Sequence, residues 1–244
     1  ELEMVLGYTK RKEEQVQKFT ENIAHQIKTP LAGLSLLLDV IREEIPQEQT
    51  IQNDIAQCFL HVERIKEFIR HLLTISRIEA GKVRFIKEPV SISGLFENVR
   101  QAVQTDCKLT FDCADKDAQI YADGQWITEA LINLVENACR AARAAQQMQE
   151  QPEVKIVAVV HADKCVIKVV DNGNGFADGD TAHLFDRFET QGDYASFQTG
   201  IGLNLSRLVV EAHSGTIQAY NRQDGQGAVF RVVLPQFALK QGKI

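Results

Sequence analysis

Several features are scarce in this sequence, and each shortage argues against a class of protein. The five cysteines are odd in number and form no CxxC pair, which argues against a disulfide scaffold and a zinc site and fits a reducing cytosol. No run of about 18 apolar residues occurs, so we expect no membrane segment. Positive charge is not in excess, and the net charge of -6 argues against nucleic acid as the main partner.

The chain also lacks an initiating Met, and no apolar core follows a basic start at its beginning. We therefore expect no signal peptide and a cytoplasmic fragment of a longer protein. Hydrophobic residues make up 44% and charged residues 25%, an ordinary globular composition. Its 244 residues are enough for one large domain or two modest ones.

The first third of the chain carries a helical pattern. Apolar residues recur in steps of three and four through residues 10–44 and again through 51–78, with Pro46 in the polar stretch between them. This predicts an antiparallel helical hairpin. A lone hairpin buries little apolar surface, and two copies would make a four-helix bundle, so we expect a homodimer.

Pro30 lies inside the first helical pattern, where a proline costs roughly 3 kcal/mol or more. It removes the hydrogen bond to the carbonyl four residues earlier, which belongs to Gln26, beside His25. The pattern predicts a kink next to this histidine.

After residues 82–88 the periodicity changes, which predicts a second domain. Alternating apolar runs indicate strands, and helical spacing separates them, so we expect an α+β sandwich with hairpin-like pairing near 154–170. The expected strands are 155–162, 165–172 and 228–235, and the expected helices are 92–104, 125–146 and 202–215.

The first polar cluster of this half is LINLVENACRAAR. Asn133 and Asn137 are four residues apart and share one helix face, with Arg140 one turn later. Amide oxygens can hold a hydrated Mg2+, and arginine can contact phosphate. The alternative is a pair of solvent-facing amides.

The second cluster is VVDNGNGF, in which Asp171 follows an apolar strand. A carboxylate is costly there without a partner, and it could accept a hydrogen bond from the exocyclic amine of a base. Gly173 and Gly175 would let the backbone approach a flat ring. The alternative is a plain Asp-Gly turn.

The third cluster is TGIGLNLS, where Gly200 and Gly202 open a helix that continues through Leu203. Free N–H groups at such a helix start can bind phosphate, although a plain turn is the alternative. The preceding polar segment, 176–199, has Phe185 and Phe188 as anchors, and we expect a mobile lid.

Together and in this order, the clusters resemble the ATP-binding domain of sensor histidine kinases. Asn133 and Asn137 match the asparagine box, DNGNG the first glycine box, LFDRF with Arg187 the phenylalanine box, and TGIGL the second glycine box. AHQIKTPL resembles the histidine box, and LLTISRIEAGK the usual end of the second dimerisation helix. The resemblance covers nearly all of residues 15–235.

The resemblance implies a dimeric four-helix bundle followed by a Bergerat-type α/β sandwich. Residues 1–14 would end an upstream signalling helix, 15–82 would form the dimerisation and phosphotransfer domain, and 88–240 the catalytic domain. The implied activity is that of a protein-histidine kinase, which phosphorylates itself with ATP and passes the phosphoryl group to a response regulator. The parent protein would lie in the bacterial cell membrane.

The resemblance also implies roles for single residues. His25 would be the phospho-acceptor, and Thr29, one turn later, would orient water for dephosphorylation of the regulator. Asn137 would bind Mg2+. The remaining ATP contacts would come from the other residues of the boxes: Asn133, Arg140, Asp171, Gly173, Gly175, Arg187, Gly200, Gly202 and Leu203.

Three positions depart from the family pattern. Gln26 replaces the usual Glu or Asp after the phospho-acceptor, Ala24 the frequent serine, and Ala141 a frequent aromatic residue. Gln26 affects catalysis, because an amide oxygen stabilises a developing imidazolium less than a carboxylate does. Two alternatives therefore stay open: a degenerate sensor that binds nucleotide and acts through protein contacts, and a related ATPase of the mismatch-repair, topoisomerase or chaperone type.

Overall fold

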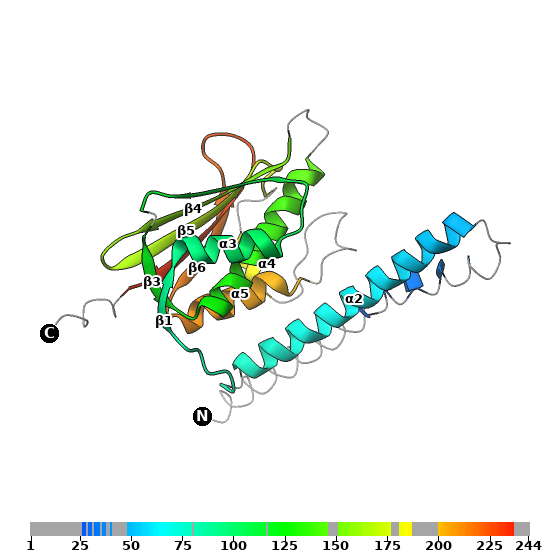
Figure 1. Cartoon of the computed structure of the whole chain (residues 1–244), viewed down its shortest axis with the longest axis horizontal. Helices are drawn as coiled ribbons and strands as arrows, with labels where there is room; N and C mark the ends of the chain where they lie inside the picture. Colours follow the sequence, from blue (N-terminus) through cyan, green and yellow to red (C-terminus); the bar gives the residue numbers. More distant parts are fainter. Residues whose placement is uncertain are drawn as a thin grey trace, which may run out of the picture. The chain divides into compact units, whose positions relative to one another are not determined.

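A computed structural model describes residues 26, 27, 29, 30, 32–34, 36, 37, 40, 48–79, 81–115, 117–145, 151–176, 181–186 and 200–236 (Figure 1). His25, Pro46, Arg187 and Phe188 lie outside these residues, as does most of the expected lid. The chain divides into two compact units. One holds the residues up to Leu73, and the other those from Thr74 to Glu189 and from Gly200 onward.

The first unit is helical, as its periodicity predicts. The described residues between Gln26 and Val40 are helical, Pro30 among them, and α2 runs over Glu48–Glu79. The two helices pack closely at Gly33, where an added Cβ would lie 3.0 Å from two ring atoms of His61. The side chain of Gln26 is half-buried and that of Thr29 is exposed.

The end of α2 is fixed by a glycine. The N–H of Gly81 donates to the carbonyl of Ile78 at 2.9 Å, and the N–H of Lys82 donates to that of Arg77 at 2.9 Å. Gly81 has φ +66°, the left-handed conformation that this type of helix end requires. The segment that follows, up to Lys87, belongs to no helix or strand.

A five-stranded mixed sheet forms the core of the second unit, in the order β2-β4-β5-β7-β6. β2 pairs in parallel with β4, and the other neighbours are antiparallel. The hairpin expected near 154–170 is therefore confirmed as β4–β5. The strands are β2 (Lys108–Cys113), β4 (Glu153–Val160), β5 (Lys164–Asp171), β6 (Thr216–Asn221) and β7 (Ala228–Pro235).

Two short strands form a separate antiparallel pair, β1 (Glu88–Ser91) with β3 (Gln119–Ala122). Glu88 lies opposite Ala122 in this ladder. The first strand of the second unit therefore begins beside the residue that precedes Asp123, the N-cap of α4.

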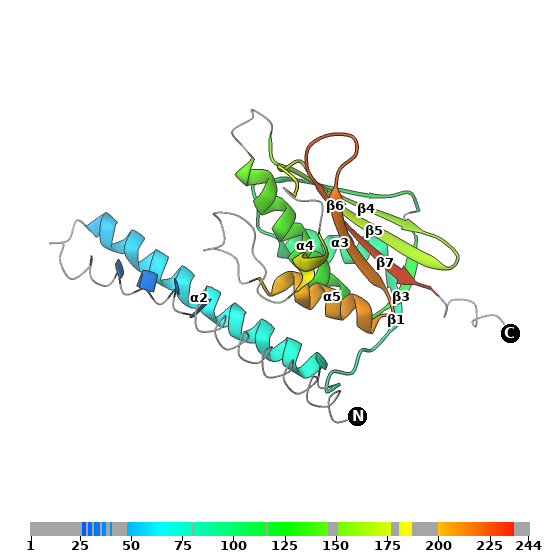
Figure 2. The same ribbon diagram turned by 180° about the vertical axis from the view of Figure 1, so that it is seen from behind.

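Three helices cover one face of the large sheet: α3 (Ile92–Ala102), α4 (Gly124–Ala144) and α5 (Gly202–Ala212) (Figures 1 and 2). Ser91 caps α3 by accepting a hydrogen bond from the N–H of Gly94, and Asp123 caps α4 through the N–H of Trp126. A 3-10 turn, η2 (Ala182–Phe185), packs beside α5.

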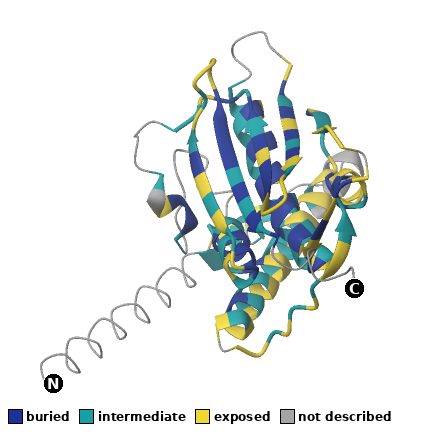
Figure 3. Cartoon of the chain, turned by 90° about the vertical axis from the view of Figure 1, so that its left-hand side faces the viewer, coloured by how far each residue is buried: buried dark blue, intermediate teal, exposed yellow. Residues whose placement is uncertain are grey.

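Alternation along the strands separates the core from solvent (Figure 3). On β5, Cys165, Ile167 and Val169 are buried, whereas Lys164 and Lys168 are exposed. The expected helix followed by an α/β sandwich is confirmed. Among the helices of the described residues, none has the length and apolar character needed to cross a membrane.

Candidate nucleotide site

The side chains of Asn133, Asn137 and Arg140 form a hydrogen-bonded row along α4, which we call the asparagine row. The side-chain nitrogen of Asn133 donates to the carbonyl of Glu129 at 3.1 Å, and that of Asn137 donates to the carbonyl of Asn133 at 2.9 Å. Both amides therefore use their nitrogen on the backbone, which fixes how their oxygens are turned. The side-chain oxygen of Asn137 accepts a hydrogen bond from Arg140 at 2.9 Å. An oxygen that can bind a cation and a guanidinium that can bind phosphate therefore lie side by side.

Asp171, the last residue of β5, is 1% exposed. Its Oδ1 accepts hydrogen bonds from the N–H of Gly173 at 2.9 Å and of Ala228 at 3.1 Å. Its Oδ2 is buried and has no hydrogen-bond partner among the residues that the structure describes. Burial is the main cause that raises the pKa of this carboxyl above 3.8. A buried carboxylate oxygen without a donor is costly, so this atom fits a ligand that brings its own N–H.

Gly173 connects the Asp171 loop to α4. A Cβ at this position would lie 2.8 Å from the backbone carbon and oxygen of Ala141, closer than real side-chain contacts allow. The loop therefore packs directly on α4, one turn beyond Asn137. Only glycine fits at this position, which gives the second polar cluster a structural reason as well as a candidate role.

Gly202 connects α5 to α4 in the same way. It is the first residue of α5, and an added Cβ would lie 2.9 Å from the side-chain oxygen of Asn133. Ser206 strengthens this contact, since its hydroxyl lies 3.2 Å from the carbonyl of Ala130 and 2.9 Å from that of Gly202. The first turn of α5, whose leading N–H groups have no partner within the helix, therefore lies beside the asparagine row with half-buried Leu203.

The remaining glycines shape the backbone around these groups. Gly200 has φ +62° just before α5, and Gly175 has φ +72° in the loop after β5. Asn221, at the end of β6, holds that loop: its Oδ1 accepts from the N–H of Phe176 at 2.6 Å, and its nitrogen donates to the carbonyl of Phe176 at 2.9 Å. No local pattern marks Asn221, because it lies 45 residues from Phe176 in the chain.

Two side chains of α5 hold the start of the phenylalanine box. The nitrogen of Asn204 donates to the carbonyl of Phe185 at 3.0 Å, and Arg207 donates to Asp186 at 3.0 Å. Phe185 itself is buried, with its ring 6.4 Å from that of Phe230. The expected anchoring role of Phe185 is therefore consistent with its environment, and the predictions for Arg187, Phe188 and a mobile lid remain predictions.

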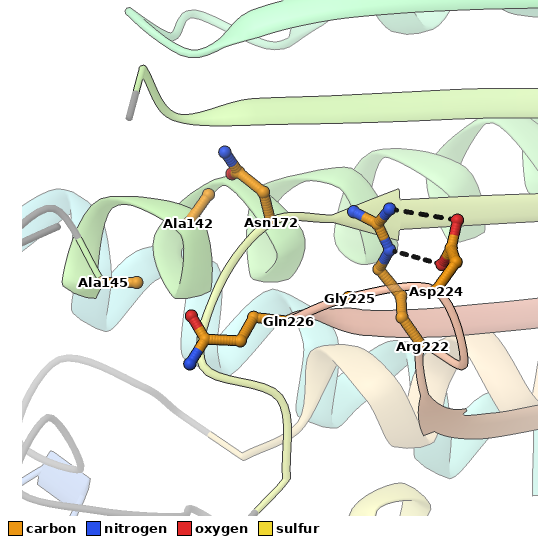
Figure 4. A pocket seen from close by; sticks show the side chains of 7 residues that line it. All are labelled: Ala142, Ala145, Asn172, Arg222, Asp224, Gly225 and Gln226. Atoms are coloured by element: carbon orange, nitrogen blue, oxygen red, sulfur yellow. Dashed lines mark hydrogen bonds and ion pairs between the residues drawn. The ribbon is translucent and has the colours of Figure 1, made fainter. Parts of the chain in front are cut away.

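A cavity of about 510 Å³ lies next to these groups and is lined by none of the predicted site residues (Figure 4). Its lining includes Asn172 and Ala142, and Arg222 and Asp224 point toward one another at 3.1 Å in Figure 4. Asn172 is already engaged, because it accepts from the N–H of Glu153 and donates to the carbonyl of Gln151. We assign no ligand to this cavity.

The three polar clusters of the sequence thus meet where β5 ends, α5 begins and α4 passes its middle. That combination of an amide-bearing helix, a buried aspartate and a glycine-led helix defines a nucleotide-binding α/β sandwich. Residues 122–238 match the family of histidine kinase-, DNA gyrase B- and HSP90-like ATPases, which makes this an ATP-binding domain. Residues 15–81 match the His Kinase A (phospho-acceptor) domain. The chain belongs to the sensor histidine kinases.

Individual relatives agree. The chain is 32% identical over 223 residues to the sensor protein KdpD of Escherichia coli, across 88% of this chain and 24% of KdpD. It resembles the histidine kinase AdeS of Acinetobacter baumannii with a TM-score of 0.65 and 24% identity, over 87% of this chain and 98% of AdeS. It also resembles the histidine kinase ThkA, solved in complex with the response regulator protein TrrA, with a TM-score of 0.69 and 21% identity, over 95% of this chain and 65% of that one. The last two likenesses show the fold. The chain spans between 24% and 55% of the length of the first curated relatives it matches.

Proposed function

We propose that this chain is the phosphotransfer and catalytic part of a sensor histidine kinase that transfers the γ-phosphoryl group of ATP to His25 and then to an aspartate of a response regulator. The observation that carries the proposal is the buried Oδ2 of Asp171, which no described residue satisfies, beside the asparagine row of α4 and the start of α5. Residues 15–82 act as the dimerisation and phosphotransfer domain and 88–240 as the catalytic domain.

The residues present fit ATP with Mg2+. Asp171 accepts a hydrogen bond from the exocyclic amine of adenine, and this satisfies the buried oxygen that the protein leaves without a donor. The N–H groups at the start of α5 face phosphate, where the helix dipole favours negative charge. The Asn137 oxygen, which accepts a hydrogen bond from Arg140 in this structure, would hold Mg2+, and Arg140 would contact a phosphate oxygen. The bound ion supplies charge neutralisation on the phosphates.

In the transfer step, a ring nitrogen of His25 forms a bond to the γ-phosphorus while the bond from that phosphorus to the bridging oxygen breaks. ADP leaves with the electron pair. The other ring nitrogen keeps its proton, and the amide oxygen of Gln26 accepts a hydrogen bond from it. Thr29, which is exposed and lies four residues after His25, orients the water that hydrolyses the phosphoaspartate of the regulator and releases inorganic phosphate.

We infer two protein partners for the helical unit, a second copy of the chain and a response regulator. α2 exposes large apolar side chains on one side, with Phe59 66%, Ile69 44% and Leu73 55% exposed, and a second copy of the chain covers them in a four-helix bundle. A response regulator is the acceptor, by analogy with the ThkA–TrrA complex. The exposed apolar side chains support the dimer because a solvated helix rarely keeps such a row.

The alternatives are separated by incubation with γ-labelled ATP and Mg2+. Label on the protein that is lost in acid and kept in base identifies phosphohistidine and supports the proposal. Release of free phosphate without labelled protein identifies an ATPase. Neither product, with nucleotide still bound, identifies a degenerate sensor, for which Gln26 is an argument and against which the intact asparagine and glycine boxes argue.

A further inference from the structure

The segment that leaves α2 is held against α4 and α5 by an aromatic contact. Phe85 lies with its ring 5.5 Å from that of Trp126 at the start of α4 and 5.4 Å, edge-on, from that of His213 at the end of α5. Such aromatic pairs are favourable beyond the burial of their surface. Phe85 is therefore bound at a defined place before the chain reaches β1.

Asp123 is the centre of the polar contacts around it. Its Oδ2 accepts from the N–H of Ile86 at 2.8 Å, and its Oδ1 accepts from the N–H of Trp126 at 3.2 Å. Its own N–H donates to Nε2 of His213 at 3.0 Å. The Asp123 carboxylate therefore links the incoming segment to the start of α4, and the backbone N–H of Asp123 links this point to the end of α5.

Lys87 adds a contact at the other helix. Its ammonium donates to the carbonyl of Ala212 at 3.1 Å, where the last carbonyls of α5 lack helical partners. Ile86 contributes through its backbone alone, since its side chain is 67% exposed. Phe85, Ile86 and Lys87 thus form a docked segment at one end of the α4–α5 pair.

This dock is far from the nucleotide residues. Asp123 precedes Asn137 by 14 positions along α4, about 20 Å at the helical rise. Gly202 starts α5 and Ala212 ends it, so the dock lies at the opposite end of α5 from the candidate site, and at the start of α4 rather than at its middle. The dock does not touch ATP, and any effect on the reaction has to come through the placement of the domain.

Docking shortens the tether between α2 and the ATP-binding domain. α2 is closed by the hydrogen bonds of Gly81 and Lys82, so only Val83 and Arg84 lie between that closure and Phe85. Extended chain covers about 10 Å from Lys82 to Phe85, and about 20 Å from Lys82 to Glu88 if the segment were undocked. For a tether that already spans the two reacting groups, the effective concentration falls roughly as the −3/2 power of tether length, so doubling the length lowers it roughly threefold.

We propose that Asp123 is a positioning residue: by docking Phe85–Lys87 it holds the ATP-binding domain on a two-residue tether to α2 and raises the rate of phosphoryl transfer to the acceptor histidine. This rests on the proposed kinase function and adds a determinant of its rate. It involves no contact with nucleotide, so it acts on the transfer step and leaves nucleotide affinity unchanged.

Ile86 offers a matched pair of variants. Ile86→Pro removes the N–H that Asp123 accepts, and combined with Phe85→Ser it undocks the segment. Ile86→Ala keeps the N–H and changes only an exposed side chain. Trp126 is the single tryptophan of the chain, so its fluorescence reports docking directly. We expect stronger acrylamide quenching of Trp126 in the double variant and wild-type quenching in Ile86→Ala.

A second variant tests tether length without touching the dock. Insertion of Gly-Ser-Gly between Arg84 and Phe85 lengthens the tether from two residues to five, the length of the undocked segment. We expect wild-type Trp126 quenching from this insertion, and autophosphorylation at saturating ATP that is slowed about threefold, as in the double variant. The affinity for an ATP analogue should stay within twofold of wild type in all of them.

The outcomes separate cleanly. Wild-type labelling rates in both the double variant and the insertion variant, or faster ones, overturn the inference. Equal Trp126 quenching in the wild type and the double variant shows that no dock exists and overturns it as well. A loss of nucleotide affinity in step with the rate assigns the residues to domain stability instead. An unlabelled wild type overturns the proposed function, and the inference with it.

Discussion

At the scale of single residues, Asp171 combines a structural cost with a candidate binding role. Two backbone N–H groups hold one of its oxygens, and the other is buried without a donor. Asp171→Asn keeps an acceptor for both N–H groups and removes the charge that burial disfavours. It also places an N–H group where the amine of adenine would donate.

We therefore expect Asp171→Asn to bind ATP about 10- to 100-fold more weakly, since hydrogen bonds to charged groups contribute about 1.5–3 kcal/mol. Stability without nucleotide should be equal or higher, because the raised pKa shows that the folded state disfavours the charge. Calorimetric titration and thermal unfolding measure the two effects. Asp224→Asn, at the neighbouring cavity, is the control and should bind as wild type. An unchanged affinity in Asp171→Asn would remove the adenine role.

Gln26 sets a second prediction at this scale. Its amide oxygen can fix the tautomer of His25, but it cannot offset the charge that develops on the ring. A correctly placed acid–base group contributes on the order of 10²–10⁴-fold, and an exposed site should lie near the low end. We expect Gln26→Glu to speed the initial rate of autophosphorylation at saturating ATP about tenfold. Glu21, four residues before His25, is the competing carboxylate. An unchanged rate in Gln26→Glu with a collapse in Glu21→Gln would move the supporting role to Glu21.

His213 gives a pH dependence. It is buried, its Nδ1 lies 2.8 Å from the carbonyl of Val209, and its Nε2 accepts from Asp123, which only the neutral ring can do. Burial is the main cause that lowers its pKa below 6.5, and the nearby ammonium of Lys87 lowers it further. The unfolded chain therefore binds the proton more readily than the folded one. Stability is complete above about pH 6.5 and falls as the pH drops toward the folded-state pKa.

We expect the free energy of unfolding, measured in urea, to fall more between pH 7.5 and pH 5.5 in the wild type than in His213→Gln. Glutamine offers an acceptor but does not titrate in this range. Parallel pH profiles for the two proteins would show that His213 does not contribute.

At the scale of elements, the end of α5 carries a local strain. Ser214 has φ 58° and occupies the left-handed position of the helix end, where the N–H of Gly215 donates to the carbonyl of Val210 at 2.9 Å. This conformation costs a non-glycine residue roughly 1 kcal/mol. Ser214→Gly should therefore raise the free energy of unfolding by about 1 kcal/mol in chemical denaturation, and Ser214→Ala should not. Destabilisation by Ser214→Gly would contradict this account.

The same scale shows what local pattern could predict. Long amphipathic helices such as α2 and α4, and apolar strands such as β4, β5 and β7, carry enough repeats to be recognised. The four-residue strands β1 and β3 do not, and β2 and β6 were also not predicted. The polar boxes were visible because their residues are close in sequence. Asn221 and Ala228 support the same site from the β6–β7 hairpin, and that contact depends on the folded sheet rather than on any nearby residue.

At the scale of the whole molecule, one chain carries both a helical unit with the phospho-acceptor sequence and a domain that binds ATP. Family membership and fold are established by the matches to both parts of the chain. The identity of the accepting side chain is still a proposal drawn from sequence. The roles proposed for Gln26, Thr29 and the docked segment all depend on this identity.

The most direct measurement is the location of the phosphate after incubation with ATP and Mg2+. The chain has six histidines, so the acceptor can be identified by peptide mapping under basic conditions and by single substitutions. We predict phosphate on His25 alone, complete loss of labelling in His25→Ala with ATP affinity retained, and full labelling in the control His71→Ala. Labelling that survives His25→Ala, or phosphate mapped to another residue in the wild type, would contradict the account.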